Sequence, residues 1–497
     1  MRELMDHTSR PLLYAQANRA RFVSELKEFI RFPSVSARPE HLRDAINCAQ
    51  WLAKHLNGIG LQHVSVIATA GRPIVYADWL HAANGPTVIV YGHYDVQPAD
   101  PLDQWRSPPF EPIEHEGDVY GRGASDDKGQ LFVHLKALEC YLHTIKRLPV
   151  NVKCLFEGEE EIGSPNFASF VERRRKALAA DVVVVSDMPM LGRNRPAITY
   201  AMRGSLSLEV EVAGPEVDLH DGLFGGAVHN PVQGLCDLFT SLQTTEGQIA
   251  IPGFYNRVRK VSEEERDYMA KTGQDEQILR TARTKMSWGD TDYTPYERTT
   301  ILPSLTVTGI TAGYQGPGPK AIIPARAKGK LNFRLVPDQN PAEIESLVRG
   351  HVAHLTPDSL HTSMKTHFAA KPVLINPAHP IIRAAAVACE KGFGTAPAFL
   401  RCGGSNPAVS VLHDTLGLPV IMMGFTLPDD HIHAPNEKFH LPNFYKGIDT
   451  SIWLLNEVRR NERRVKDGAT QMYGPTQFEL SRYRNHDYRL PLPCGKR

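Results

Sequence analysis

Five short clusters of histidine and carboxylate residues could perform metal chemistry, because their nitrogen and oxygen atoms are ligands of divalent cations. Four of them begin where a predicted strand stops, and each taken alone also fits a turn, a helix start or a local ion pair. The clusters are GHYD at 92–95, GASDDKG at 123–129, EGEEEIGS at 157–164, SD at 186–187 and DDHIHAPNE at 429–437. Their combination predicts a single metal site, because a sheet brings its strand ends together.

The spacing within these clusters indicates what individual residues would do. His93 and Asp95 are two positions apart, so in an extended segment their side chains share a face and Asp95 can orient the histidine ring. Glu159, Glu160 and Glu161 are adjacent, which is electrostatically costly unless a cation compensates them. Nitrogen and oxygen ligands without cysteine suit zinc or manganese. A two-metal site also requires a shared carboxylate and an unligated acid that moves protons.

Helical and strand patterns alternate through the first third of the chain and again near its end. Helices are predicted over 14–31, 41–56, 131–145, 166–178, 381–391 and 442–463, and strands over 73–77, 87–91, 151–156, 181–185 and 419–423. This alternation predicts an α/β fold with a central, mostly parallel sheet and flanking helices. Ligands bind at the carboxyl ends of such strands, which is where the clusters lie.

The pattern changes at Gly204 and resumes near residue 376. Strands over 205–212, 305–308, 327–335 and 362–367 and helices over 231–242 and 341–355 predict an inserted α+β domain, which includes a polar stretch over 257–298 with little strand character. We therefore expect an α/β catalytic domain formed by residues 1–203 and 376–466, an inserted domain over 204–375 and a C-terminal tail over 467–497.

The composition of the chain disfavours several classes of function. Its 497 residues have a formal net charge of +1, so no global field attracts nucleic acid or an anionic membrane surface. No apolar run approaches the roughly 18 residues of a membrane helix, and the start of the chain lacks a secretory pattern, so we expect a cytoplasmic protein. The seven cysteines have no CxxC spacing and are expected to be reduced. The expected partner is a small molecule.

The motifs together resemble those of the di-zinc metallopeptidase family that contains carnosinase-type dipeptidases, carboxypeptidase G, aminoacylase and succinyl-diaminopimelate desuccinylase. GHYDVQP, GRGASDDKG, EEEIGS and HAPNE occur in the family's order across most of the chain. DLHDGLFGGAVHNP from Asp218, NFRLVPDQNP from Asn332 and the turn from Gly403 to Pro407 are most similar to the dipeptidase branch. The resemblance implies a hydrolase that forms a homodimer through its inserted domain, which would also act as a lid.

The same resemblance implies a ligand for each side of a two-metal centre. Asp126 would bridge both metals, His93 and Asp187 would complete one site, and Glu161 and His433 would complete the other. Two divalent metal ions per subunit are therefore expected. Zinc is the first expectation, and manganese and cobalt are alternatives that share such ligands.

The remaining candidate residues would act on the substrate. Glu160 would take a proton from the metal-bridging water, which leaves a hydroxide to attack, and return it to the leaving amine, while Asp95 orients a histidine ligand. His220 would reach the active site of the partner subunit and stabilise the oxyanion. Arg334 and Ser405 would bind the carboxylate of the substrate, the arginine by a bidentate contact.

One residue departs from the carnosinase-type pattern. Those dipeptidases commonly have Arg-Glu-Gly-Gly-Ser in this turn, whereas the present chain has Cys402 between Arg401 and Gly403. The change removes an acid that can pair with the free amine of a substrate. We expect hydrolysis of a dipeptide or short peptide with a free C-terminal carboxylate, and an N-acyl amino acid deacylase is the alternative. A non-catalytic binding protein is disfavoured, because every expected ligand and the base are present.

Overall fold

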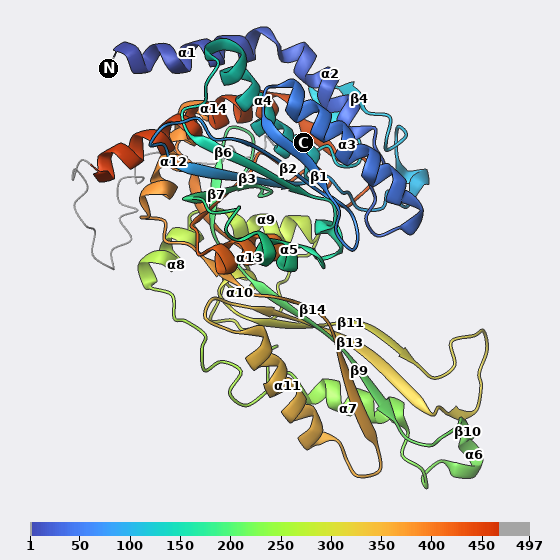
Figure 1. Ribbon diagram of the computed structural model, residues 1–497. Helices are drawn as coiled ribbons and strands as arrows, with labels where there is room; N and C mark the ends of the chain where they lie inside the picture. The colour runs from blue at the N-terminus through green and yellow to red at the C-terminus, as the bar shows by residue number, and fades with distance from the viewer. Residues whose placement is uncertain (1, 467–497) are drawn as a thin grey trace, which may run out of the picture.

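Two separately packed hydrophobic cores divide the molecule into a rounded body and a narrower arm (Figure 1). The computed structural model describes residues 2–466, and the predicted C-terminal tail over 467–497 lies outside them. The body is built on a nine-stranded sheet and the arm on a four-stranded sheet. The change of pattern in the sequence at Gly204 coincides with the first strand of the arm.

The main sheet has the strand order β1-β2-β6-β3-β7-β17-β8-β15, and β16 pairs with β8. β3 pairs in parallel with β6 and β7, and β7 pairs in parallel with β17, so the centre of the sheet is parallel. Valine and isoleucine fill β3 and β7 because both faces of a parallel sheet are buried. The strands are β1 (Gln62–Ile67), β2 (Ile74–Trp79), β3 (Thr87–His93), β6 (Asn151–Glu157), β7 (Val182–Ser186), β8 (Ala197–Met202), β15 (Val373–Leu374), β16 (Ala398–Cys402) and β17 (Val420–Met423).

Helices cover both faces of this sheet, as the alternating pattern predicts (Figure 1). α4 and α14 lie on one face and contact each other, whereas α5 and α13 lie on the opposite face. α4 is buried along almost its whole length, which makes it the central helix of the body. The helices of the body are α1 (Arg2–Ala17), α2 (Arg19–Ile30), α3 (Leu42–Gly58), α4 (Lys128–Ile145), α5 (Phe167–Arg174), α12 (Pro380–Phe393), α13 (Pro407–Leu416) and α14 (Leu441–Lys466).

A small antiparallel sheet joins two distant parts of the chain. Its strands, in spatial order, are β18 (Lys438–His440), β5 (Asp118–Tyr120) and β4 (Ile113–His115). The register places Lys438 opposite Tyr120, so the segment that precedes β18 lies beside the segment that follows β5. Two of the chemical clusters, at 123–129 and 429–437, are brought together in this way.

The arm is an antiparallel sheet in the order β11-β13-β9-β14 with two helices packed on it. Alternate residues of β9 are buried, because only one face of this sheet contacts the helices. A short pair of strands and a helical turn extend from its far end (Figure 1). The elements are β9 (Gly204–Ala213), β11 (Ser304–Ala312), β13 (Arg326–Leu335), β14 (His361–Ala370), α7 (Pro231–Ser241), α11 (Pro341–Leu355), β10 (Leu219–His220), β12 (Ile322–Ile323) and α6 (Asp221–Phe224).

Three short helices that interrupt the arm in sequence pack at its junction with the body: α8 (Glu263–Ala270), α9 (Gln274–Thr281) and α10 (Pro295–Thr300). The Tyr296 hydroxyl donates to the Arg401 carbonyl at 2.9 Å and accepts from the Arg401 N–H at 2.8 Å. Glu265 pairs with the guanidinium of the same arginine at 2.7 Å. These helices therefore brace β16 and the glycine turn that follows it.

The predicted α/β fold class with a mostly parallel central sheet is confirmed, and two predicted helices need correction. The stretch over 14–31 forms two helices, since α1 ends at Ala17 and α2 begins at Arg19. The helix predicted over 166–178 ends at Arg174. Within residues 2–466, no helix combines the length and apolar character needed to cross a membrane. The six cysteines in that part of the chain are all free thiols.

Candidate functional site

The carboxyl ends of three parallel strands place the candidate residues at one edge of the main sheet. His93 is the last residue of β3, Glu160 and Glu161 follow β6, and Asp187 directly follows β7. Gly92 allows α4 to approach β3 closely, since a Cβ there would lie 2.9 Å from the Asp127 carboxylate on the loop that leads into that helix. The close approach of α4 to β3 at Gly92 therefore helps to position this edge of the sheet.

The two oxygens of Asp126 each contact a different histidine. Oδ1 lies 3.1 Å from Nε2 of His93, and Oδ2 lies 2.8 Å from Nε2 of His433. Glu161 joins the second contact, with its Oε2 at 3.3 Å from the His433 ring. His93, Asp126 and Glu161 each present one ligand atom within 4.8 Å of the others. Asp187 is held beside them by Asn406, whose amide donates to its carboxylate at 3.0 Å.

This donor set fits divalent metal ions. Glu161 Oε1 is buried without a hydrogen-bond partner, which is costly for a carboxylate oxygen unless a cation binds it. Burial raises the pKa of Asp187 to about 7, and the nearby carboxylate of Asp126 adds to the shift. Imidazole nitrogen and carboxylate oxygen are the ligands that zinc and manganese accept. Divalent cations would therefore balance the acids gathered at this edge.

Glu160 and Glu159 differ sharply in their surroundings. Both side-chain oxygens of Glu159 are engaged elsewhere, by the Arg72 N–H at 3.1 Å and by the Asn166 amide at 2.7 Å. Among residues 2–466, no side chain or backbone group binds the Glu160 carboxylate by a hydrogen bond or ion pair. Burial raises the pKa of Glu160 well above that of an exposed glutamate; the imidazole of His93 opposes the shift and neighbouring carboxylates add to it. Glu160 is the acid that remains available for proton transfer.

Asp95 contacts His93 partly through its backbone, which the sequence spacing did not indicate. Its carbonyl oxygen lies 3.1 Å from Nδ1 of His93, and its carboxylate Oδ1 lies 3.4 Å from the same atom. The two carboxylate oxygens instead accept from the backbone N–H groups of Glu160 and Glu161, at 3.2 and 3.0 Å. Asp95 thus fixes one histidine and the turn that carries both glutamates.

Arg334 and Ser405 meet at the junction between body and arm. The Arg334 guanidinium donates to the Ser405 hydroxyl at 2.8 Å, and Ser405 precedes the asparagine that holds Asp187. Arg203 stabilises the same turn by donating to the Gly403 carbonyl at 3.0 Å. Burial raises the pKa of the Cys402 thiol, which leaves it uncharged beside these two guanidinium groups. Among the described residues, Arg203 and Arg334 therefore give this junction a positive charge, and we call it the positive wall. It adjoins the metal-ligand cluster through Asn406.

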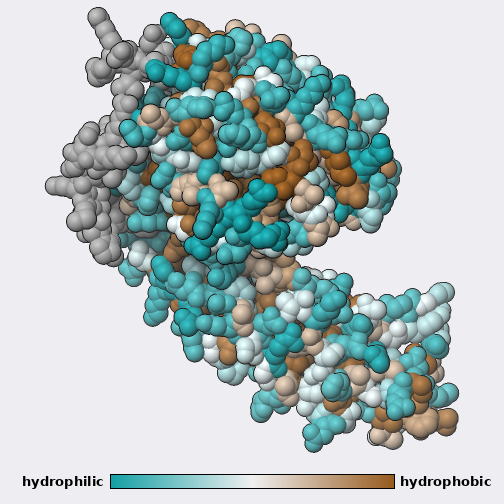
Figure 2. Space-filling view, in the orientation of Figure 1, coloured by the Kyte–Doolittle hydropathy of each residue, from teal (hydrophilic) through white to brown (hydrophobic). Residues whose placement is uncertain are grey.

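His220 does not join the cluster within one chain. Its side chain is 61% exposed, and its Nδ1 accepts from the Gly222 N–H at 3.0 Å. Figure 1 shows its strand, β10, at the end of the arm farthest from the main sheet. Figure 2 shows apolar side chains gathered at this end, where Val217 and Leu223 are exposed. His220 therefore lies outside the metal-ligand cluster of its own chain.

Three residues without a predicted role position the candidate ligands. Gln97 donates to the Glu161 carboxylate at 2.8 Å, Asn406 holds Asp187, and Glu437 accepts from the Asp126 N–H at 3.0 Å. Each lies within one of the motifs that carry the family resemblance, so membership of a motif was the signal that could have identified these residues. Their exact partners depend on long-range contacts that sequence spacing does not reveal.

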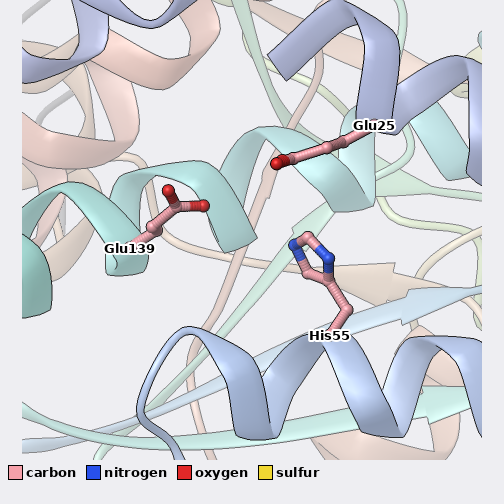
Figure 3. A group of neighbouring side chains, drawn as sticks. All are labelled: Glu25, His55 and Glu139. Atoms are coloured by element: carbon pink, nitrogen blue, oxygen red, sulfur yellow. The ribbon is translucent and has the colours of Figure 1, made fainter. Parts of the chain in front are cut away.

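A second group of acids and a histidine lies on helices α2, α3 and α4, away from the sheet edge. Figure 3 shows Glu25, His55 and Glu139 pointing toward one another. The buried ammonium of Lys136 lies 2.7 Å from Glu139 and 2.8 Å from His55, and it also binds Glu25. Because a cation of the chain already satisfies these three groups, they form an ion-pair network rather than a metal site.

The fold, the histidine and carboxylate cluster and the comparisons with known proteins define a metallopeptidase. Residues 89–456 match the model of peptidase family M20/M25/M40, and the chain belongs to this family. The Cys-Gly metallodipeptidase dug1 of Schizosaccharomyces pombe is 31% identical over 458 residues, which cover 88% of this chain and 95% of that protein. The human Beta-Ala-His dipeptidase is 31% identical over 454 residues, covering 87% of this chain and 89% of that protein.

Solved structures support the same assignment. The M20 family metallo-carboxypeptidase Sso-CP2 from Sulfolobus solfataricus superposes with a TM-score of 0.81 at 31% sequence identity, covering 88% of this chain and 99% of that chain. The resemblance to the dipeptidase branch of a metallopeptidase family is confirmed. The family implies divalent metal ions as cofactors.

Metal binding at the cluster should stabilise the fold. We expect a metal concentration 100 times the dissociation constant to add about 2.7 kcal/mol to the free energy of unfolding, because the ligands assemble only in the folded state. Thermal denaturation with and without added zinc measures this shift. His433→Ala should reduce it, whereas His431→Ala, in the same exposed loop, should not. Equal melting temperatures of the wild-type protein with and without metal would contradict the assignment.

Proposed function

We propose that this enzyme hydrolyses the peptide bond of dipeptides or short peptides that carry a free C-terminal carboxylate. The observation that carries the proposal is the placement of Asp126 between His93 and His433, with the unengaged Glu160 carboxylate beside them. The names of the relatives, which act on Cys-Gly and on Beta-Ala-His, support a small peptide as the substrate.

The cluster divides into ligands for two divalent cations. His93 and Asp187 would hold one, Glu161 and His433 would hold the other, and Asp126 would contribute one oxygen to each. Zinc is the proposed metal, since the set combines imidazole and carboxylate, although manganese and cobalt accept the same ligands. When bound, such ions polarise the scissile carbonyl and make the attacking water more acidic.

Glu160 would carry the proton of the reaction. Its carboxylate accepts a proton from the attacking water and then donates it to the amine nitrogen that leaves. Burial raises the pKa of this carboxylate, which makes it a stronger acceptor for the proton of the attacking water. The hydrogen bonds from the Glu160 and Glu161 N–H groups to Asp95 keep the turn in place during both transfers.

The positive wall at the junction would bind the carboxylate end of the substrate. Arg334 has guanidinium donors beyond its bond to Ser405, and a carboxylate is the anion that matches this fork. Cys402 occupies the position at which carnosinase-type enzymes have a glutamate. This difference favours a second candidate activity, the hydrolysis of N-acylated amino acids, whose blocked nitrogen needs no acid.

The exposed end of the arm would complete the active site of a second subunit. His220 is exposed, and apolar side chains gather near it, with Val217 and Leu223 exposed, which favours a protein contact at this end. We therefore propose a homodimer formed through the arm, in which His220 donates a hydrogen bond to the developing oxyanion of the partner. The free thiols of the described cysteines accord with a reducing compartment, and we propose the cytoplasm.

Replacing Glu160 should separate chemistry from metal binding. Glu160→Gln keeps the size of the side chain but removes its basicity, so we expect turnover of a dipeptide to fall by about 10²- to 10⁴-fold with metal content unchanged. Glu159→Gln is the matched control and should retain most of the turnover, because this neighbour is bound to Arg72 and Asn166. Normal turnover by Glu160→Gln would refute the assigned base.

Assays on free and N-acetylated dipeptides distinguish the two candidate activities.

Mixing two inactive variants tests the role of His220 across the dimer. In a heterodimer of His220→Ala and Glu160→Gln subunits, one site receives an intact Glu160 and an intact His220. Random exchange of subunits should then recover about a quarter of the wild-type activity, since half of the dimers are mixed and each has one complete site. Mixtures that remain inactive after demonstrated subunit exchange would exclude a role for His220 in the partner's site.

A further inference from the structure

Glu437 is a fully buried carboxylate that the proposed reaction does not use. Its Oε2 accepts from the Arg122 guanidinium at 2.7 Å and from the Gly123 N–H at 2.9 Å. Its Oε1 accepts from the N–H groups of Ser125 at 2.9 Å and Asp126 at 3.0 Å. Three backbone donors and one guanidinium thus converge on a single side chain, in a cradle of the kind that backbone N–H groups form around anions.

The backbone of Glu437 also binds the loop over 121–126, which its side chain contacts. Its carbonyl oxygen accepts from the Gly121 N–H at 2.9 Å, which extends the pairing between β18 and β5 by one step. Glu437 therefore lies between β18 and His433, four residues from the histidine, while its side chain holds the residue that contacts that histidine. The loop over 121–126 is fixed to the segment over 433–437 by both the main chain and the side chain.

Ser125 makes a second connection, which reaches residues on both sides of His433. The Ser125 hydroxyl is 2.6 Å from the Lys438 carbonyl and 3.0 Å from the Asp430 carboxylate. Asp430 also accepts from the Leu427 N–H at 2.7 Å. Contacts at both ends of the 430–437 segment therefore determine where His433 stands relative to Asp126.

The segment between these anchors has an unfavourable backbone. His431, His433 and Asn436 have φ angles of 57°, 61° and 64°, in the left-handed region that residues with a Cβ rarely adopt. Such conformations persist only where surrounding contacts impose them. Asn436 provides one contact, by accepting from the Arg106 N–H at 2.8 Å, and Glu437 and Asp430 provide the others.

We propose that Glu437 is a positioning residue that couples Asp126 to His433, and that metal affinity depends on it. The inference rests on the metal centre proposed above. A carboxylate accepts from all four donors, whereas a glutamine would turn its NH₂ group toward one pair of them and leave the buried Arg122 without a counter-charge. The loop and the strained segment would then separate, although neither Glu437 nor Arg122 binds a metal.

The test compares metal affinity in two variants that each remove a buried charge. Glu437→Gln should weaken zinc binding, measured by competition with a chelator, by about 10- to 100-fold, and excess zinc should restore part of the lost turnover. Glu139→Gln is the matched control. It breaks the contacts of this buried α4 residue with Lys136 of the same helix and with Arg21 of α2, about 18 Å along the helix from the site. It should lower the melting temperature but leave zinc affinity unchanged.

The outcomes are distinct. If Glu437→Gln binds zinc as tightly as the wild type, or if both variants lose affinity equally, Glu437 has no specific positioning role. If Glu437→Gln does not fold, Glu437→Asp, which keeps the charge but shortens the reach, should show a smaller loss, and unchanged affinity in that variant overturns the proposal. If the wild-type protein itself binds no zinc, the proposed metal centre fails and this inference fails with it.

Discussion

The carboxylate of Asp126 is the constraint on which the rest of the site depends. One of its oxygens faces a histidine at the end of β3, and the other faces a histidine more than 300 positions later in the chain. To satisfy both contacts, the start of α4, the edge of the main sheet and the small sheet of β18 and β5 must be assembled together. Distant parts of the chain therefore meet at this one carboxylate.

Holding several carboxylates at one edge is electrostatically unfavourable, and rigid packing makes it possible. Asp95 binds the turn of Glu160 and Glu161, Asn406 binds Asp187, and buried strands fix the backbone from which these side chains project. The raised pKa values of Glu160 and Asp187 are a consequence of this crowding and burial. Under the proposed function, the same crowding would favour the binding of divalent cations at this edge.

The sequence predicted the parts of the fold that local patterns determine. The continuous apolar runs of β3 and β7 and the alternation in β9 were sufficient for the fold class. The polar clusters pointed to a metal site, and the family resemblance supplied the individual residues around Asp126. The short helices α8 to α10 and the small β18–β5 sheet were missed, because they are stabilised by contacts between distant segments rather than by a periodic pattern. The role of Glu437 depends on partners 311 to 315 residues away. The assignment of His220 to a neighbouring subunit came from family resemblance alone.

The proposal that Asp126 is a ligand shared by two metal ions is tested most directly by the number of ions bound per chain. Elemental analysis after dialysis measures this number in the wild-type protein and in Asp126→Asn. An asparagine has only one side-chain oxygen and no negative charge, so it cannot supply one anionic oxygen to each of two ions. We expect about two ions in the wild type and fewer than one in a folded Asp126→Asn variant, because the shared ligand is lost from both positions. A folded variant that retains two ions would show that Asp126 is not a shared ligand.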